Sequence, residues 1–395
     1  MVDAVYSVLE VNMIQLKRII GWGKRLLLDL RENRVYQNDK TAQRFNKSHK
    51  CPELTEEEKK EIDQFWSTYN VKFQEYEWHR MYYTVTGIHD PRYIPVPFAE
   101  RVLYRFYNKQ DFVPAYADKN MFQLFLPSMC FPTSIGKRVN SRYYDKAGNY
   151  CGEELTQKYI DAVYDAFLED CDGRANEIVI KDAVGSRQGR GVKKSAITSK
   201  ESLNQLLSQS ASENIVIQMA VQQHPFFAQF NEDSVNIIRI TTWRKENEVY
   251  ILSPCIRFGI KGSHTDVAYV NGTEIINAVK INRDGTISRK YVTLNGEWAD
   301  LPDGINTVVP EWESMLKYVK SNALALPYFD IVAWDITVDV NSKVVCIEYN
   351  LKWPGTIVYQ YAHGPMAGDL TDDLLSFLKD KNNAQLIPPC IRISR

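Results

Sequence analysis

Two carboxylates and one carboxamide near the end of the sequence have the types and spacing of a metal site. Asp335 lies in a Val- and Ile-rich segment, Glu348 lies in the next one, and Asn350 follows two residues later. Residues 340–343 are typical of a tight reversal, so we expect an antiparallel strand pair that brings Asp335 near Glu348. Period-two alternation puts Asn350 on the same face as Glu348. Three such oxygens suit Mg²⁺, although two acids at a solvated strand end give the same pattern.

A lysine at the end of another apolar segment is followed by a glycine-rich loop. Lys181 ends the segment, and the loop then contains Gly185, Ser186, Arg187, Gly189, Arg190 and Gly191. Glycine lets backbone N–H groups approach an anion closely, and a lysine on a strand supplies a fixed charge. The pattern therefore predicts a phosphate site. Its spacing is neither that of a P-loop nor that of a dinucleotide fingerprint, so a glycine-rich turn without a ligand remains open.

Together these residues resemble the ATP-grasp superfamily, whose members hold ATP between two α+β lobes and activate a carboxylate as an acyl phosphate. D-alanyl-D-alanine ligases of this superfamily carry Asp, Glu and Asn at intervals of thirteen and two residues, the intervals of the three donors above. They also have a lysine in an Asp-Lys pair that opens a helix, and Asp118-Lys119 matches it. The resemblance implies ATP and Mg²⁺ as cofactors, with Lys119 and Lys181 binding the phosphates.

In such enzymes the adenine lies against a hinge after the strand that follows the glycine loop, here residues 215–221. The resemblance assigns the nucleotide base to four residues, Gln218, Met219, Ala220 and Val221. Gln222 and Gln223 stand where an acidic ribose ligand is usual, so the resemblance leaves the ribose-binding residue open.

Two arginines are candidates for the reacting groups. The D-alanyl-D-alanine ligases place an arginine two residues before the metal-binding Asp, where this chain has Ala333. We expect Arg239, and with less support Arg257, to neutralise charge on the intermediate. Candidate acceptor residues are Asn236, Ser263 and His264, although a single loop histidine is more often only a hydrogen-bonding residue.

The chain is similar to the sugar-transfer associated ATP-grasp group, found among polysaccharide biosynthesis proteins of bacteria. The similarity rests on residues 234–241, 257–266 and 347–350. It implies a cytoplasmic ligase that joins a carboxylate to an amine, with an amino acid or a uronic sugar as one small-molecule or sugar-linked partner. A kinase acting on a hydroxyl, or an ATP-binding module without turnover, are the alternatives.

Composition excludes several other classes of protein. The chain has 395 residues, with 48 Lys and Arg against 49 Asp and Glu, so no global field favours nucleic acid as a partner. The seven cysteines form no CxxC pair, which indicates reduced thiols.

The elements that must position these residues are helices alternating with Val- and Ile-rich strands. We expect strands at 176–183, 214–219, 234–243, 249–257, 275–281, 331–340 and 344–349. Tight reversals at 282–285 and 340–343 predict antiparallel strand pairs and hence an α+β fold. The resemblance implies that this fold is of the ATP-grasp type. We expect a helical N-terminal region over 1–108, a small lobe over 109–218 and a large lobe over 219–395.

Two N-terminal helices are also expected. The Thr55-Glu58 capping box predicts a helix start. Residues 5–30 predict an amphipathic helix with a basic face, which suits either peripheral membrane contact or packing on its own domain.

Overall fold

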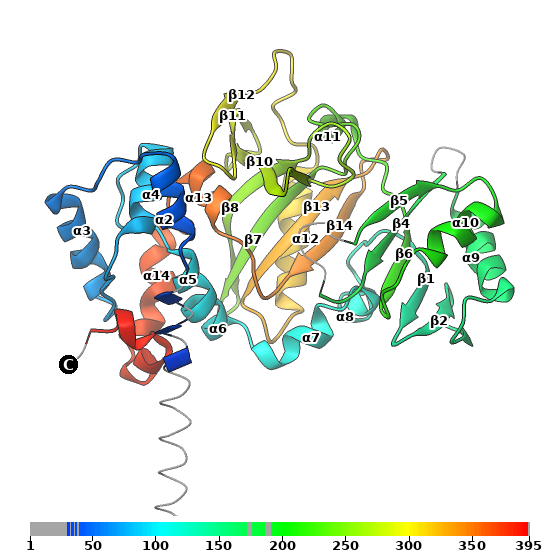
Figure 1. Ribbon diagram of the computed structural model, residues 1–395, viewed down its shortest axis with the longest axis horizontal. Coiled ribbons are helices and arrows are strands. Elements are labelled where there is room, and N and C mark those ends of the chain that lie inside the picture. The colour runs from blue at the N-terminus through cyan, green and yellow to red at the C-terminus, as the bar shows by residue number, and fades with distance from the viewer. Residues whose placement is uncertain are drawn as a thin grey trace, which may run out of the picture. The chain divides into compact units, whose positions relative to one another are not determined.

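The structure, a computed structural model, describes residues 30–393 except 32, 35, 38, 172–175 and 186–190. The chain divides into two compact units, shown in Figure 1. One contains the chain up to Phe106 together with the segment from Gly368 onward, and the other contains Tyr107–Ala367. Residues 5–29 of the predicted basic helix, and Ser186 and Gly189 of the predicted phosphate loop, lie outside the described residues.

The first unit is helical in its described part. Its α-helices are α2 (Thr41–Ser48), α3 (Glu56–Ser67), α4 (Glu77–Thr86), α5 (Val96–Phe98) and α14 (Thr371–Leu375). Shorter 3-10 turns follow at Ser376–Lys379, Lys381–Leu386 and Pro389–Ile391. Helix α3 begins with the predicted capping box, in which the Thr55 hydroxyl accepts from the Glu58 N–H at 3.2 Å and Glu58 accepts from the Thr55 N–H at 2.7 Å. Trp66 and Ile62 on its inner face are fully buried.

The second unit begins with short helical segments and a six-stranded antiparallel sheet. Helix α6 (Tyr104–Tyr107) ends at the first residue of this unit, and α7 (Val113–Tyr116), a 3-10 helix (Lys119–Met121) and α8 (Phe122–Phe125) follow. The strands are β1 (Ser134–Val139), β2 (Arg142–Asp145), β3 (Tyr150–Gly152), β4 (Glu177–Asp182), β5 (Lys193–Ala196) and β6 (Ile215–Met219). They lie in the order β3-β2-β1-β6-β4-β5. Helices α9 (Gln157–Asp170) and α10 (Lys200–Ser208) pack with them around one apolar core.

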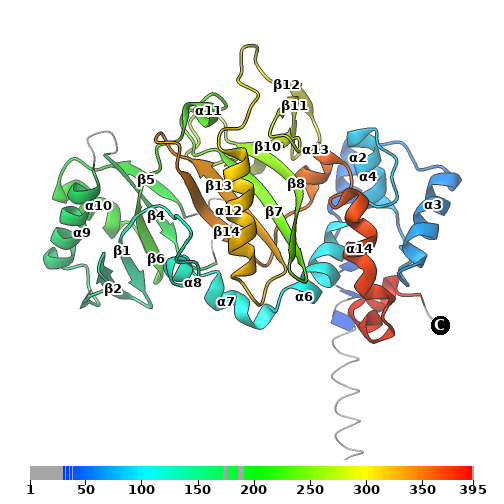
Figure 2. The ribbon, with the colours of Figure 1, turned by 180° about the vertical axis from the view of Figure 1, so that it is seen from behind.

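A larger, eight-stranded antiparallel sheet follows. Its strands are β7 (Ile237–Lys245), β8 (Glu248–Phe258), β9 (Val267–Val270), β10 (Thr273–Ile281), β11 (Ile287–Thr293), β12 (Trp298–Asp300), β13 (Ile331–Val338) and β14 (Val344–Asn350). They lie in the order β12-β11-β10-β8-β7-β13-β14, with β9 paired to β10. Helix α11 (Pro225–Ala228) precedes this sheet, and α12 (Trp312–Leu324) packs along its back, as Figure 2 shows. Helix α13 (Ile357–His363) packs against β8 and β10.

The predicted α+β fold is therefore confirmed. Each of the seven predicted strands is present, with ends shifted by up to three residues. The two predicted reversals join β10 to β11 and β13 to β14 as antiparallel pairs. No helix in the described part of the chain has the length and apolar character needed to cross a bilayer.

Candidate functional site

Three charged side chains lie in one row across the large sheet. Asp335 on β13 is paired with Glu348 on β14 and, on its other side, with Arg239 on β7. Directly opposed residues of antiparallel strands share a face, so the three side chains point to the same side. Their neighbours Trp334 and Ile336 point the other way, into the core beneath α12. The predicted approach of Asp335 to Glu348 is confirmed.

Arg239 and Asp335 form a buried two-point ion pair. The Nε and Nη2 groups of Arg239 both donate to the Asp335 carboxylate, the second at 2.8 Å, and Nη1 donates to the Pro354 carbonyl at 2.9 Å. Arg239 is 7% exposed and Asp335 4%. The Asn350 amide also donates to Asp335 Oδ2, at 3.3 Å. Burial raises the pKa of Asp335, against the opposing influence of Arg239.

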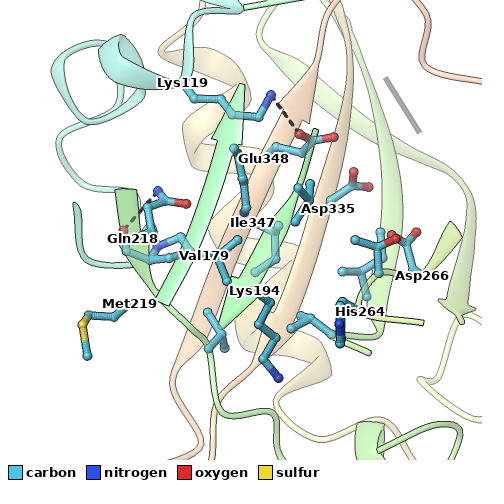
Figure 3. Close-up of a pocket in the computed structure, with 17 residues that line it drawn as sticks. Lys119, Val179, Lys194, Gln218, Met219, His264, Asp266, Asp335, Ile347 and Glu348 are labelled. Atoms are coloured by element: carbon cyan, nitrogen blue, oxygen red, sulfur yellow. Dashed lines mark hydrogen bonds and ion pairs between the residues drawn. The ribbon is translucent and has the colours of Figure 1, made fainter. Parts of the chain in front are cut away.

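Two lysines from the smaller sheet and its flanking turn face this row. Lys119 Nζ lies 3.3 Å from Glu348 Oε2, as Figure 3 shows. Burial lowers the pKa of Lys181 to about 8, an effect that Glu348 opposes and Lys119 reinforces. Burial would raise the pKa of Glu348, but the two lysines outweigh it and hold that pKa at about 2. Both lysines and Glu348 thus form one interacting charge cluster.

Lys119 is positioned by a short capped turn. The Asp118 side chain accepts from the Asn120 N–H at 2.9 Å and caps the 3-10 helix Lys119–Met121, as the Asp-Lys pair predicted. The Lys119 N–H donates to the Ala183 carbonyl at 3.0 Å, which ties this turn to the end of β4. The two predicted phosphate lysines therefore come from segments that are bonded to each other.

These side chains and several apolar ones line one cavity (Figure 3). The charged lining includes Lys119, Lys181, Asp335 and Glu348. The apolar lining includes Val179, Met219, Val221, Ile237 and Ile347. Apolar side chains in one cavity with converging cations and carboxylates suit a ligand with an aromatic base and a polyphosphate.

The predicted hinge only partly faces the cavity. Gln218, Met219 and Val221 line it, whereas Ala220 does not. The N–H groups of Met219 and Ala220 donate to Thr133 and Glu177 carbonyls, at 2.9 and 3.0 Å, so both are used within the sheet. These two N–H groups are therefore not available to contact a nucleotide base in this structure. The groups of the predicted hinge that remain for such a contact are its side chains and the Val221 segment.

The described glycines of the predicted phosphate loop have the conformation that requires glycine. Gly185 and Gly191 have φ angles of 73° and 79°, in the left-handed region. A Cβ at Gly191 would also collide with the Asp182 carboxylate. Substitution at Gly191 would thus distort the end of β4 beside Lys181.

Arg257 forms a second buried pair on the neighbouring strand. It lies opposite Ile237, two residues along β7 from Arg239, and so on the same face. Its Nη2 lies 2.6 Å from Asp266 Oδ2, and Nη1 donates to the Tyr359 hydroxyl at 3.2 Å. The two predicted catalytic arginines are therefore brought to one face, each with its own carboxylate.

The three acceptor candidates fall into two kinds. His264 lines the cavity. Ser263 instead donates to the Thr265 carbonyl at 2.7 Å. Asn236 is fully buried and joins the Phe227 carbonyl, at 2.9 Å, to the Gly259 N–H, at 3.2 Å. Asn236 and Ser263 thus hold the loop that presents His264.

Sequence reasoning gave no site role to two charged cavity residues, Lys194 and Asp266, although Asp266 lies within the family-like segment 257–266. A buried arginine such as Arg257 needs a counter-ion, which would have pointed to the nearby Asp266. Lys194 lies opposite Val179 on β5, a short polar strand. No alternating apolar pattern marks that strand in the sequence.

The donor set fits Mg²⁺ better than a softer metal. Asp335, Glu348 and Asn350 offer carboxylate and amide oxygens, which Mg²⁺ prefers, usually with phosphates and water completing its sphere. Among the described residues, no group of three His, Cys, Asp or Glu side chains could hold a metal. A zinc-type site is therefore not seen in that part of the chain.

Residues 99–372 match the sequence profile of the sugar-transfer associated ATP-grasp family, and the chain belongs to this family. The resemblance stated from the sequence is thus confirmed. A search of the curated proteins finds no match.

Several solved structures are similar at low identity. D-alanyl-alanine synthetase A from Vibrio cholerae O1 biovar eltor is 13% identical with a TM-score of 0.39, over 67% of this chain and 65% of that one. The ATP-grasp ligase PsnB with precursor peptide PsnA2 and AMPPNP is 14% identical with a TM-score of 0.38, over 69% and 63%. An L-amino acid ligase from Bacillus licheniformis is 13% identical with a TM-score of 0.33, over 68% and 47%. This chain spans less than two thirds of each of these proteins.

Proposed function

We propose that the protein is an ATP-dependent ligase that joins a carboxylate to an amine through an acyl phosphate. The observation that carries the proposal is the row of Glu348, Asp335 and Arg239, which shares a cavity with Lys119 and Lys181. Membership of an ATP-grasp family supports ATP as the nucleotide.

We assign the nucleotide base to the apolar side chains of the cavity and the phosphates to its lysines. Lys181 and Lys119 would balance phosphate charge, and Glu348 orients Lys119 through an ion pair at 3.3 Å and interacts electrostatically with Lys181. Asp335, Glu348 and Asn350 would hold Mg²⁺, which when bound neutralises charge on the transferred phosphoryl group.

The arginines support a carboxylate as the acceptor. A carboxylate oxygen of the acceptor attacks the γ-phosphorus, and the bond to the ADP oxygen breaks. The amine nitrogen then attacks the acyl carbon, and phosphate leaves with the electron pair of the C–O bond while the amine loses a proton to solvent. Arg239 and Arg257 lie on adjacent strands of one face, where they can offset the negative charge of both steps.

The family description, sugar-transfer associated, supports a role linked to sugar transfer, and we propose that this role lies in bacterial polysaccharide biosynthesis. We therefore propose an amino acid or a uronic sugar as one substrate, and a cytoplasmic reaction because ATP is supplied there. A kinase would need a base beside a hydroxyl acceptor, and His264 is the cavity residue that favours this second candidate.

A trapping experiment separates the two functions. The protein is incubated with ATP, Mg²⁺ and hydroxylamine, together with each member of a panel of amino acids and uronic acids. The ligase reaction yields ADP, phosphate and a hydroxamate with at least one carboxylate. A stable phosphomonoester without free phosphate or hydroxamate would establish a kinase instead.

A further inference from the structure

The Asp335 carboxylate accepts hydrogen bonds from donors within the protein. A carboxylate offers about four acceptor positions. Two receive the Nε and Nη2 groups of Arg239, and a third receives the Asn350 amide at 3.3 Å. Asn350 therefore uses its N–H₂ group to donate to Asp335, another of the proposed metal ligands. Two of the three proposed metal ligands are thus arranged for each other and for an arginine.

Burial decides how this arrangement can change. Arg239 and Asp335 are both more than nine-tenths buried, so separating them without replacement would leave two uncompensated charges away from water. A divalent cation at Asp335 supplies a replacement for the positive charge that the carboxylate would lose. An anion beside Arg239 would do the same for the guanidinium. Arg239 and Asp335 are therefore most easily separated when a cation binds Asp335 and an anion binds Arg239 together.

We propose that Arg239 is a latch on Asp335 that couples the cation to the anionic acceptor, an inference that rests on the proposed function. In the free protein the two-point ion pair holds the carboxylate against Arg239. When Asp335 serves as a cation ligand, Arg239 loses part of its hold and its N–H groups turn to the acceptor carboxylate. The coupling is reciprocal, so the nucleotide with its cation strengthens acceptor binding and the acceptor strengthens cation binding. The acceptor is then expected to bind after the nucleotide.

Arg257 provides a matched comparison within the same site. It is as buried as Arg239 and lies on the same face, but its carboxylate partner is Asp266 and not a proposed metal ligand. A change at Arg257 alters the same kind of charge at a similar place. It leaves the Arg239–Asp335 pair in place.

The experiment measures ADP affinity by calorimetry over a Mg²⁺ titration in the parent protein, Arg239→Lys and Arg257→Lys. Lysine keeps the positive charge but cannot form the two-point contact, so the comparison isolates the latch from simple charge. We expect Arg239→Lys to lower the Mg²⁺ concentration at half effect by about tenfold or more, the loss of one charge-assisted hydrogen bond. In Arg257→Lys we expect the Mg²⁺ concentration at half effect to stay within about twofold of the parent value. This change is too small to reflect the loss of a charge-assisted bond to Asp335.

A second measurement needs only the parent protein. The Nε–H signal of Arg239, assigned from its contacts in the NMR spectrum, should exchange with water faster after Mg²⁺ and ADP are added, while that of Arg257 stays unchanged. Equal protection of Arg239 before and after addition would overturn the latch even if Arg239→Lys does not fold.

The remaining outcomes are also decisive. A higher Mg²⁺ requirement in Arg239→Lys would mean that Arg239 prepares Asp335 for the cation, and an unchanged one would mean that the pair is passive. Equal shifts of the Mg²⁺ requirement in Arg239→Lys and Arg257→Lys would mean that the effect is one of general electrostatics. Each of these overturns the latch alone, because ADP still binds with Mg²⁺. If the parent protein binds no ADP, the nucleotide site and the latch fall together.

Discussion

Lys181 should take up a proton when nucleotide phosphate binds. Burial lowers its pKa to about 8 in the free protein, so at pH 8 about half of the Lys181 side chains are neutral. A phosphate beside the amine favours the charged form and raises that pKa again. Binding should therefore take up about 0.1 proton at pH 7, about 0.5 at pH 8 and about 0.9 at pH 9, the neutral fractions given by a pKa of about 8.

The assay is calorimetry of ADP binding without metal, in two buffers of different ionisation enthalpy at each pH. Because the neutral form of Lys181 must gain a proton to bind well, affinity should fall as pH rises above 8, approaching tenfold per pH unit. Lys181→Met should remove the proton uptake and keep the apolar stem. Lys200→Met is the control, because Lys200 is paired with Asp161 on the surface. Uptake that does not grow between pH 7 and 9, or that persists in Lys181→Met, would refute the reasoning.

Three further predictions follow from the charges and burial described above. Glu348→Gln should reduce turnover by a factor on the order of 10² or more and should also lower the free energy of unfolding, because it removes the carboxylate that offsets Lys119 and Lys181. Asp335→Asn should lower the free energy of unfolding by roughly 3 kcal/mol, because it leaves the buried Arg239 without its carboxylate. Activity assays measure the loss of turnover, and denaturant titrations measure the loss of stability. Burial lowers the pKa of His79 to about 4, so the folded state resists its protonation. The free energy of unfolding should therefore fall as pH drops from about 6.5 to 4, by up to about 1.4 kcal/mol per pH unit. Hydrogen exchange of α3 and α4 should lose this pH dependence in His79→Gln and keep it in the control His49→Gln, because His49 is exposed. If residues 5–30 form a membrane-binding helix, anionic vesicles should sediment the protein at low salt and release it at high salt, whereas equal recovery with neutral vesicles would favour packing on the domain.

The local part of the site could be predicted from the sequence. Asp335, Glu348 and Asn350 lie on two strands joined by a short reversal, so chain geometry alone fixes which of them meet. The Asp118-Lys119 turn is likewise set locally, because the Asp118 side chain accepts from the N–H of Asn120, two residues along the chain. The predicted strands were the long apolar ones, which the alternation of Val and Ile identifies.

The non-local part could not be predicted in the same way. Arg239 meets Asp335 only because β7 pairs with β13 in one particular register, and the two residues are 96 positions apart. The sequence therefore suggested a free arginine and a free carboxylate, although the structure pairs them. The short strands β2, β3 and β5 carry polar side chains at many positions, and their pairing depends on neighbouring strands more than on their own pattern.

The most direct test of the proposed chemistry is the fate of the acceptor oxygen. A carboxylate that supports ADP release in the hydroxylamine screen is prepared with ¹⁸O in its carboxyl group, and the released phosphate is examined by mass spectrometry. Formation of an acyl phosphate followed by amine attack at the acyl carbon leaves one labelled oxygen in each phosphate. Unlabelled phosphate, a labelled phosphomonoester, or no carboxylate-dependent ADP release across the panel would contradict the ligase mechanism.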